Sequence, residues 1–249
     1  MGFGKGLFFA ALTGQRQLSD SERALQDLLM TAVTVPCDEK SGSTGDYFKN
    51  ATPQGLSAMV DIGDKYRLGN GVPQSEKLAF YYYLLAGNQG HAEALYLVAL
   101  CLYSGTGVEK NEAKAYRLME SAAIRGYAMA QYYSGVHDKE IGRISSAKSN
   151  FKSAAKQGHA FSQYCLADIY IDEWINGQEK SLKKGMFWYL CAYLHGNSSA
   201  RASSMAKEQI DYRVQHGYPE RELQLEINRI KMAYPHYLNS PKQPNWGSC

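Results

Sequence analysis

Two stretches of this 249-residue chain repeat each other, and this repeat limits the possible folds more than any other feature. The first, GNGVPQSEKLAFYYYLLAGNQGHAEA, runs from Gly69 to Ala94, and the second, GTGVEKNEAKAYRLMESAAIRGYAMA, runs from Gly105 to Ala130. Alignment on the last glycine of each stretch extends the pattern to four copies, centred on Gly90, Gly126, Gly158 and Gly196. A repeat of roughly 36 residues predicts an array of similar units that bury their apolar faces against one another.

Small residues return in four columns around these glycines. Eleven residues before the glycine stand Ala79, Ala115, Ala147 and Gly185, and four before it stand Ala86, Ala122, Ala154 and Ala192. Two residues after it stand Ala92, Ala128, Ala160 and Ser198, and four after it stand Ala94, Ala130, Ser162 and Ala200. Small side chains at helical spacing let two helices approach closely, so the columns predict paired helices.

The glycines mark the joints between these helices. Each repeat glycine is expected to end a helix in a left-handed conformation, which costs other residues energy. The GNGV and GTGV stretches turn the chain back at the other joint. The apolar periodicity predicts an all-α chain of helical hairpins. Its expected helices are Leu56–Leu68, Ser75–Gln89, His91–Ser104, Glu112–Arg125, Ala128–His137, Ser146–Gln157, Ala160–Ile171 and Leu182–His195.

The pattern resembles the SEL-one-like repeat family, a subgroup of the tetratricopeptide-like α-solenoids. The matching residues in the first copy are Ala58, Ile62, Gly63, Tyr66, Gly69, Gly71, Val72, Ala79, Tyr82, Tyr83, Ala86 and Gly90. Later copies match at Ala115, Ala122, Ala123, Gly126, Trp188, Tyr189, Ala192 and Gly196. The resemblance covers about residues 51–200. It implies a right-handed solenoid of stacked hairpins with helical caps at both ends, whose first helices line a concave groove.

The second half of the array is irregular. The turn motif is missing after Gly126, and after Gly158 it is replaced by a longer, charged stretch, DEWINGQEKSLKKG, which is expected to be a loop across residues 172–185. The irregularity is either sequence drift or a shaped binding feature. Trp174, in this expected loop, either fills a neighbouring gap or anchors a partner.

The chain is predicted to have three parts, divided at residues 50 and 200. Residues 1–50 contain an expected capping helix over 15–36, which begins at the capping box SDSE. Residues 51–200 hold the repeats, and residues 201–249 hold C-terminal capping helices and an irregular tail. The N-terminus MGFGKGLFFAALTGQRQ resembles a signal peptide, but its apolar run is short and no A-x-A site follows. Secretion and a packing segment both remain open, and a cytoplasmic location is favoured over a periplasmic or secreted one.

Composition and motifs argue against several classes of function. A net charge of +3 without a Lys/Arg-rich run does not favour nucleic acid, and no apolar stretch is long enough to span a membrane. The five cysteines are odd in number and lack a CxxC pair, which favours reduced thiols and no metal site; they are Cys37, Cys101, Cys165, Cys191 and Cys249. No catalytic or cofactor motif is present. His91 and His159 share one repeat column, which favours a place at a helix boundary over catalysis.

These observations predict a non-catalytic protein that binds a protein or peptide partner in the groove of its first helices. An immunity protein that neutralises a toxin and a bacterial signalling regulator are two forms of this hypothesis. The alternative is an exported envelope or secreted factor that acts on host or cell-wall components. The candidate partner-binding residues are polar or aromatic residues that packing does not require: Asp64, Arg67, Glu93, Tyr96, Gln131, Tyr132, Tyr164, Asp168 and Trp174. Repeat packing is the competing interpretation for each of them, and Tyr96, Tyr132 and Tyr164 share a column.

Overall fold

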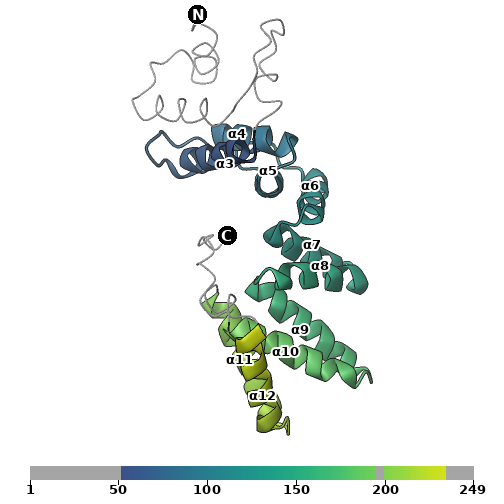
Figure 1. The fold of residues 1–249 in the computed structure, drawn as a ribbon. Helices are drawn as coiled ribbons and strands as arrows, with labels where there is room; N and C mark the ends of the chain where they lie inside the picture. Colours follow the sequence, from purple (N-terminus) through teal and green to yellow (C-terminus); the bar gives the residue numbers. More distant parts are fainter. Residues whose placement is uncertain (1–51, 195–198, 234–249) are drawn as a thin grey trace, which may run out of the picture. The chain divides into compact units, whose positions relative to one another are not determined.

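The computed structural model describes residues 52–194 and 199–233 of the chain, and these ranges form ten α-helices, α3 to α12, and no β-strand (Figure 1). Consecutive helices pack in pairs, as the stack of helical hairpins predicts. The chain divides into two compact units, here called unit 1, Met1–Arg125, and unit 2, Gly126–Cys249. The predicted capping helix over 15–36 lies outside the described residues.

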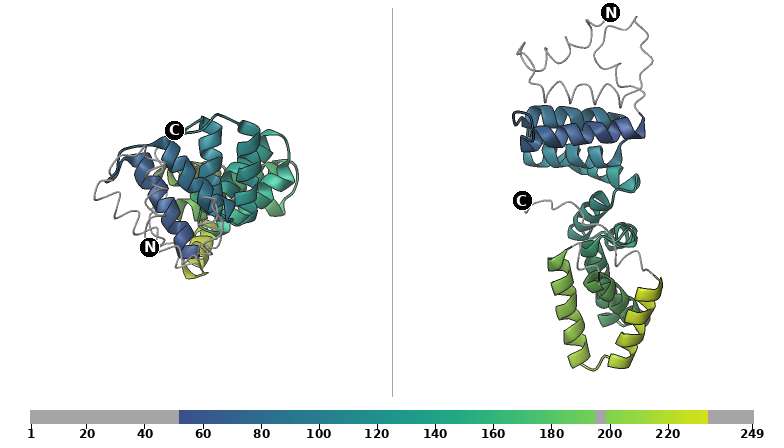
Figure 2. Two further views of the ribbon diagram at one scale, coloured as in Figure 1. Left: turned by 90° about the horizontal axis from the view of Figure 1, so that it is seen from above. Right: turned by 60° about the vertical axis from the view of Figure 1, so that its left-hand side comes forward.

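Unit 1 contains two helical hairpins. Its helices are α3 (Pro53–Leu68), α4 (Glu76–Asn88), α5 (Ala92–Ser104) and α6 (Glu112–Ile124). The helix α3 packs along α4, and α5 packs along α6. The two hairpins contact each other where α4 packs against α5 (Figure 2). The side chains of Thr52, Ser75 and Asn111 each accept a hydrogen bond from a backbone N–H in the first turn of the helix that follows. These caps satisfy donors that the first turn leaves unpaired, and they fix where the helices begin.

Unit 2 continues the pattern with two hairpins and a C-terminal pair. Its helices are α7 (Ala128–Glu140), α8 (Ile144–Lys156), α9 (Ala160–Ile175), α10 (Lys180–Leu194), α11 (Ala200–Gln215) and α12 (Glu220–Ala233). One core cluster joins α8 to α9 around Phe151 and Leu166, and a second joins α9, α10 and α11 around Met186 and Leu190. The helix α12 buries only Ile230.

The small columns lie where helices meet, as the sequence predicts. Eleven residues before the repeat glycine, Ala79, Ala115 and Ala147 are at most 2% exposed, and Ala86, Ala122 and Ala154 in the next column are fully buried. The repeat glycines Gly90, Gly126 and Gly158 have φ of 85°, 92° and 86°, which confirms the left-handed stop. Gly196 lies outside the described residues.

Two other glycines allow an aromatic ring to touch the backbone of a first helix. A Cβ atom at Gly63 in α3 would lie 2.4 Å from Cε1 of Tyr83 in α4. A Cβ atom at Gly135 in α7 would lie 2.8 Å from the ring of Phe151 in α8. Both rings are completely buried, so the glycines set how closely each hairpin closes.

The expected loop over residues 172–185 is wrong. The helix α9 continues past Ile171 to Ile175, and α10 begins at Lys180, so only four residues separate them. Trp174 therefore lies in the last turn of a helix. The helix α9 ends just before Gly177, which has a left-handed φ of 94°. The charged composition of the segment favoured a loop over this helix end. The helix α7 also runs past its predicted end at His137, to Glu140.

The cysteines that the structure describes are free thiols. Cys101 and Cys191 are buried, and Cys165 is half-buried. Burial raises the pKa of Cys101 to about 11 and that of Cys165 to about 12, so both stay protonated at neutral pH. None of the helices in the described ranges combines the length and the apolar character needed to cross a membrane.

Candidate functional site

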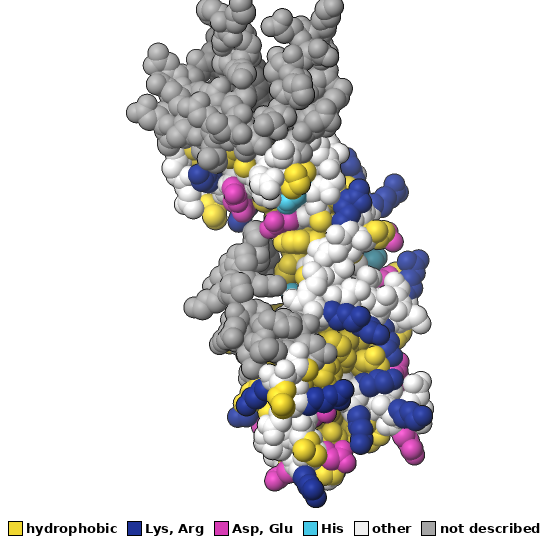
Figure 3. Space-filling view, viewed as in Figure 1, with side chains coloured by type: hydrophobic (Ala, Val, Ile, Leu, Met, Phe, Trp, Pro, Cys, Tyr) yellow, Lys and Arg dark blue, Asp and Glu magenta, His cyan; other side chains and the backbone are white. Residues whose placement is uncertain are grey.

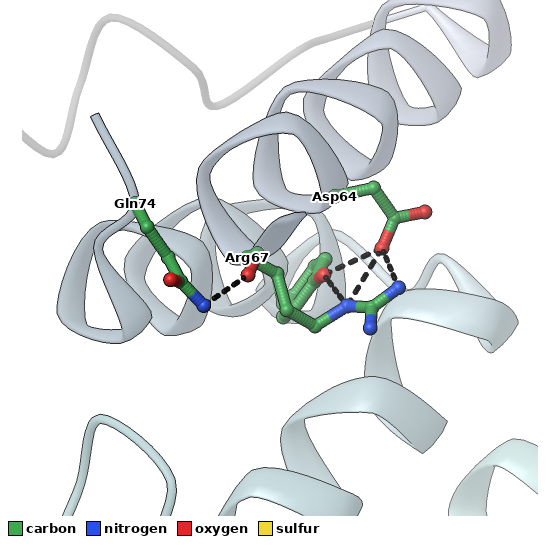
Figure 4. Close-up of polar contacts among 4 residues, drawn as sticks. Asp64, Arg67 and Gln74 are labelled. Atoms are coloured by element: carbon green, nitrogen blue, oxygen red, sulfur yellow. Dashed lines mark hydrogen bonds and ion pairs between the residues drawn. The ribbon is translucent and has the colours of Figure 1, made fainter. Parts of the chain in front are cut away.

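Asp64 and Arg67 lie together on α3, and a tyrosine from α4 holds them in place (Figure 4). The Tyr83 hydroxyl donates to Oδ1 of Asp64 at 2.7 Å, and Nε and Nη2 of Arg67 donate to the same oxygen at 3.3 and 3.2 Å. Arg67 Nε also reaches the Tyr83 hydroxyl at 3.3 Å. The Arg67 and Asp64 side chains remain 34% and 30% exposed. Oδ2 of Asp64 makes no hydrogen bond to a described residue, and Figure 4 shows it pointing away from the cluster.

Unit 2 contains an equivalent arrangement. The hydroxyl of Tyr189 in α10 donates to Oδ1 of Asp168 in α9 at 2.5 Å. The Tyr164 ring packs on the Tyr189 ring with centroids 5.6 Å apart, and the Arg213 guanidinium from α11 lies 5.2 Å from the centre of the Tyr189 ring. Burial raises the pKa of Asp168, although the hydrogen bond from Tyr189 opposes this effect. Oδ2 of Asp168 also makes no hydrogen bond within the described part of the chain.

The two arrangements occupy the same repeat positions. Asp64 and Asp168 each stand six residues after the small residue of their first helix, and Tyr83 and Tyr189 each stand seven residues before a repeat glycine. The two repeats between them carry the apolar pairs Leu100 and Met119, and Val136 and Phe151, at these positions. Packing therefore does not require the Asp–Tyr pair, because apolar residues fill the same sites in repeats of the same fold.

Removal of the Tyr189 hydroxyl should destabilise unit 2. Tyr189→Phe leaves the carboxylate of Asp168 without its described donor, and hydrogen bonds to charged groups contribute ~1.5–3 kcal/mol. We expect urea unfolding at pH 7 to show a loss of about 1.5 kcal/mol. Tyr83→Phe is the matched comparison and should cost less, because Asp64 keeps the hydrogen bonds from Arg67. If Tyr189→Phe is as stable as the parent protein, this hydrogen bond makes no net contribution to the free energy of unfolding.

Tyr132 lies in an aromatic cluster of unit 2. Its ring contacts the rings of His159, Phe161 and Phe151, with centroids 4.9, 6.1 and 6.1 Å apart. Burial raises the pKa of Tyr132 to about 12. The neighbouring Gln131 is 7% exposed, and its Oε1 accepts a hydrogen bond from Nε2 of Gln157. Of these two predicted site residues, Gln131 is buried and Tyr132 is half-buried.

His159 and His91 are helix caps, which confirms their predicted place at helix boundaries. Nδ1 of His159 accepts from the Ser162 backbone N–H at 3.2 Å, at the start of α9. Nδ1 of His91 accepts from the Ala94 backbone N–H at 3.3 Å, at the start of α5. His159 is 6% exposed, whereas His91 is half-buried. Burial lowers the pKa of His159 to about 4, so this ring is neutral at physiological pH.

The remaining predicted site residues lie apart from the two Asp–Tyr pairs. Tyr96 is 2% exposed and packs inside unit 1, which agrees with the packing interpretation and leaves it inaccessible in this conformation. Glu93 lies half-buried in the first turn of α5. Trp174 is 39% exposed at the end of α9. The structure therefore joins Asp64 with Arg67, and Tyr164 with Asp168, and it does not join the others to either pair.

A hollow of about 670 Å³ lies elsewhere in unit 1, between the start of α4 and the turn that follows α5. It is lined by Ser75, Glu76, Lys77, Gly105, Gly107, Val108 and Glu109, none of which is a predicted site residue. No cluster of three His, Cys, Asp or Glu side chains that could hold a metal ion occurs within residues 52–194 and 199–233.

Sequence reasoning missed three members of the two arrangements. Tyr83 and Tyr189 occupy a recurring tyrosine position of the repeat motif, and their common column together with the recurring aspartates was a usable signal. Arg213 comes from α11, beyond the last repeat, and no pattern in the sequence connects it to Tyr189.

Three segments of the chain match the family model of the Sel1 repeat: residues 56–91, 92–127 and 160–197. The segment between them, which contains the irregular α7–α8 hairpin, is not matched. The family model thus supports the copies aligned on Gly90, Gly126 and Gly196. The copy aligned on Gly158 has the same fold, because Gly158 is left-handed and Ala147 and Ala154 are buried like their counterparts in the other copies.

Curated relatives are similar to this chain in sequence, and a solved structure is similar to it in fold. The chain is 30% identical over 153 residues to chitin synthase regulatory factor 4 of Schizosaccharomyces pombe. This match covers 60% of this chain and 24% of the relative. It is 26% identical over 158 residues to chitin synthase regulator SKT5 of Saccharomyces cerevisiae, which covers 59% of this chain and 23% of the relative. The chain thus spans about a quarter of the length of these relatives. A protective antigen of uropathogenic Escherichia coli with an SLR fold superposes on 79% of this chain and 40% of its own, with a TM-score of 0.54 and 19% identity.

Proposed function

We propose that this Sel1-like repeat protein is a non-catalytic adaptor, and that the first helices of its hairpins hold a protein or peptide partner. Sel1-repeat proteins are generally protein-interaction scaffolds. Two of the relatives are named as regulators of chitin synthase. Between the two narrower hypotheses, a regulator and an immunity protein, these names favour a regulator. The exported alternative depends on the N-terminal segment, which lies outside the described residues.

One observation supports the proposal more than any other: each unit offers a carboxylate that is fixed at one oxygen and open at the other. Tyrosine hydroxyls hold Oδ1 of Asp64 and Oδ1 of Asp168, whereas neither Oδ2 bonds to a described residue. A carboxylate that is already oriented loses little conformational freedom when it accepts a further hydrogen bond. The complementary groups on a partner are N–H donors, from a Lys or Arg side chain or from an extended backbone.

The binding role of Asp64 can be tested without disturbing the hairpin. In Asp64→Asn, the amide oxygen can still accept from Tyr83, but an NH₂ group replaces the open acceptor. We expect a photo-crosslinking amino acid in place of the exposed Asp61, one helical turn before Asp64 on α3, to form an adduct with a partner protein in cells of the native host. Asp64→Asn should reduce the yield of this adduct at least fivefold, which corresponds to about 1 kcal/mol of lost binding. Mass spectrometry would identify and quantify the adduct.

The matched control places the crosslinker at Lys114, on the exposed side of α6. An adduct of equal yield at position 114, or one at position 61 that Asp64→Asn leaves unchanged, would contradict binding at the first helices. Circular dichroism of each variant would confirm that the helices are intact, so a lost adduct cannot be attributed to unfolding.

A further inference from the structure

The charges on two helices of unit 2 are all of one sign. The helix α8, ISSAKSNFKSAAK, carries three lysines and no acidic residue, and the same is true of α10, KSLKKGMFWYLCAYL. Every other helix of unit 2 carries at least one Asp or Glu. Both basic helices are the second helices of their hairpins, so their surface is distinct from the one proposed above for partner binding.

The lysines of the two helices converge on one aromatic ring. Tyr170 of α9 lies between them, with Nζ of Lys148 4.1 Å and Nζ of Lys184 5.6 Å from the ring centre. Lys152 follows Lys148 by one helical turn, and Lys180 precedes Lys184 by one turn, so each pair shares a helix face. We call the surface formed by these five residues the basic face. Figure 3 shows apolar side chains bordered by Lys and Arg side chains over α8, α9 and α10.

A carboxylate already occupies one edge of the basic face. Glu173, near the end of α9, accepts from Nζ of Lys148 at 2.5 Å through Oε1 and from the hydroxyl of Ser181 at 3.1 Å through Oε2. Burial alone would raise the pKa of Glu173, but these two hydrogen bonds lower it. Lys152, Lys180 and Lys184 form no ion pair with any residue in the described ranges. Of the four lysines of the basic face, only Lys148 is therefore paired with a carboxylate of the described residues.

We propose that the basic face binds an acidic segment of a protein partner, and that Glu173 competes with it for Lys148. Charge complementarity supports this occupant, because the face holds an excess of positive charge and already binds a carboxylate side chain. The cationic groups are confined to two short helices around one ring. A membrane surface or a nucleic acid would be met by a wider spread of basic residues. Exposed ion pairs are screened by salt, so the affinity should fall as ionic strength rises.

The test measures the binding of a fluorescein-labelled dodecapeptide of alternating Glu and Ser by fluorescence anisotropy at low salt. The full chain should bind it. Lys152→Glu with Lys184→Glu should weaken binding about tenfold or more, whereas Glu173→Gln should strengthen it about threefold, because it removes the internal negative charge that pairs with Lys148. Since one change weakens and the other strengthens binding, loss of folding cannot explain both results.

Matched controls distinguish binding at the basic face from a general effect of net charge and from binding at the first helices. Lys207→Glu with Lys231→Glu makes the same change in charge on α11 and α12 of the same unit and should keep the parent affinity. Asp64→Asn should also keep it, so failure here and failure of the adaptor proposal are distinguishable. The inference is overturned if the peptide does not bind, if Glu173→Gln does not strengthen binding, or if the control pair loses as much affinity as the test pair. Tighter binding of oligothymidylate or of phosphatidylserine vesicles would also overturn it.

Discussion

Gly63→Ala should destabilise unit 1 by about 1–3 kcal/mol. The added Cβ would lie 2.4 Å from Cε1 of Tyr83, and that ring is completely buried and cannot move aside freely. Overpacking costs ~1–3 kcal/mol, and displacement of the ring also breaks the hydrogen bond to Asp64, worth roughly 1 kcal/mol. The better helix propensity of Ala returns ~1 kcal/mol. Hydrogen exchange should show faster exchange in α3 and α4 and unchanged exchange in unit 2.

Gly87→Ala is the matched control for this change. Gly87 is also a buried helical glycine, in α4, but its added Cβ would lie 3.4 Å from Cδ2 of Leu95, an ordinary contact distance. Gly87→Ala should therefore be neutral or slightly stabilising. In a Tyr83→Ala background the penalty of Gly63→Ala should disappear. A Gly63→Ala variant as stable as Gly87→Ala would show that the ring and helix do not pack as described.

Unit 2 should lose stability as the pH falls from about 6.5 to about 4. The unfolded chain binds a proton at His159 with an ordinary pKa of 6.5, whereas burial lowers the pKa of the folded state to about 4. Between these values the unfolded state binds more protons, so acid favours unfolding by at most ~1.4 kcal/mol per pH unit and about 3 kcal/mol in total. Protonation would also place a hydrogen on Nδ1, which accepts from the Ser162 N–H. Because Trp174 and Trp188 lie in unit 2, tryptophan fluorescence during urea unfolding can follow the loss.

His159→Asn should make this pH dependence shallower. Asn can cap α9 in place of the imidazole but has no proton to bind in this range. The variant should be less stable at pH 7.5, since the contact with the Tyr132 ring is lost. The control, His91→Asn, changes the same repeat column in unit 1 and should leave the acid sensitivity of unit 2 unchanged. An equally steep acid loss in His159→Asn and the parent protein would rule out His159 as its cause.

The local features of the fold could be predicted because they depend on neighbouring residues. A left-handed glycine ends a helix whatever packs around it, so Gly90, Gly126 and Gly158 could be identified from their spacing. The helix expected from Ser75 does start there, with Ser75 as its N-cap. Burial of the small columns followed from their recurrence, because a repeated small residue indicates a repeated close approach.

The error at residues 172–185 had a tertiary cause. The charges of this segment are typical of a loop, yet Glu173 lies in a helix, where it bonds to Lys148 of the preceding helix and Ser181 of the following one. A carboxylate with partners on two neighbouring helices is stabilised by contacts that single-segment patterns cannot contain. Tyr96 was a candidate for binding on its chemistry, but packing buries it.

Periodicity, caps and glycine conformation are readable along the chain, so the all-α class, the hairpin repeat and most helix boundaries could be predicted from the residues alone. Contacts between side chains of different helices could not be predicted in this way. The pairing of Asp64 with Tyr83, the approach of Arg213 to Tyr189 and the convergence of Lys148 and Lys184 on Tyr170 each join different helices. The distances between such groups are set by how closely the helices pack, and helix packing is a property of the folded chain as a whole.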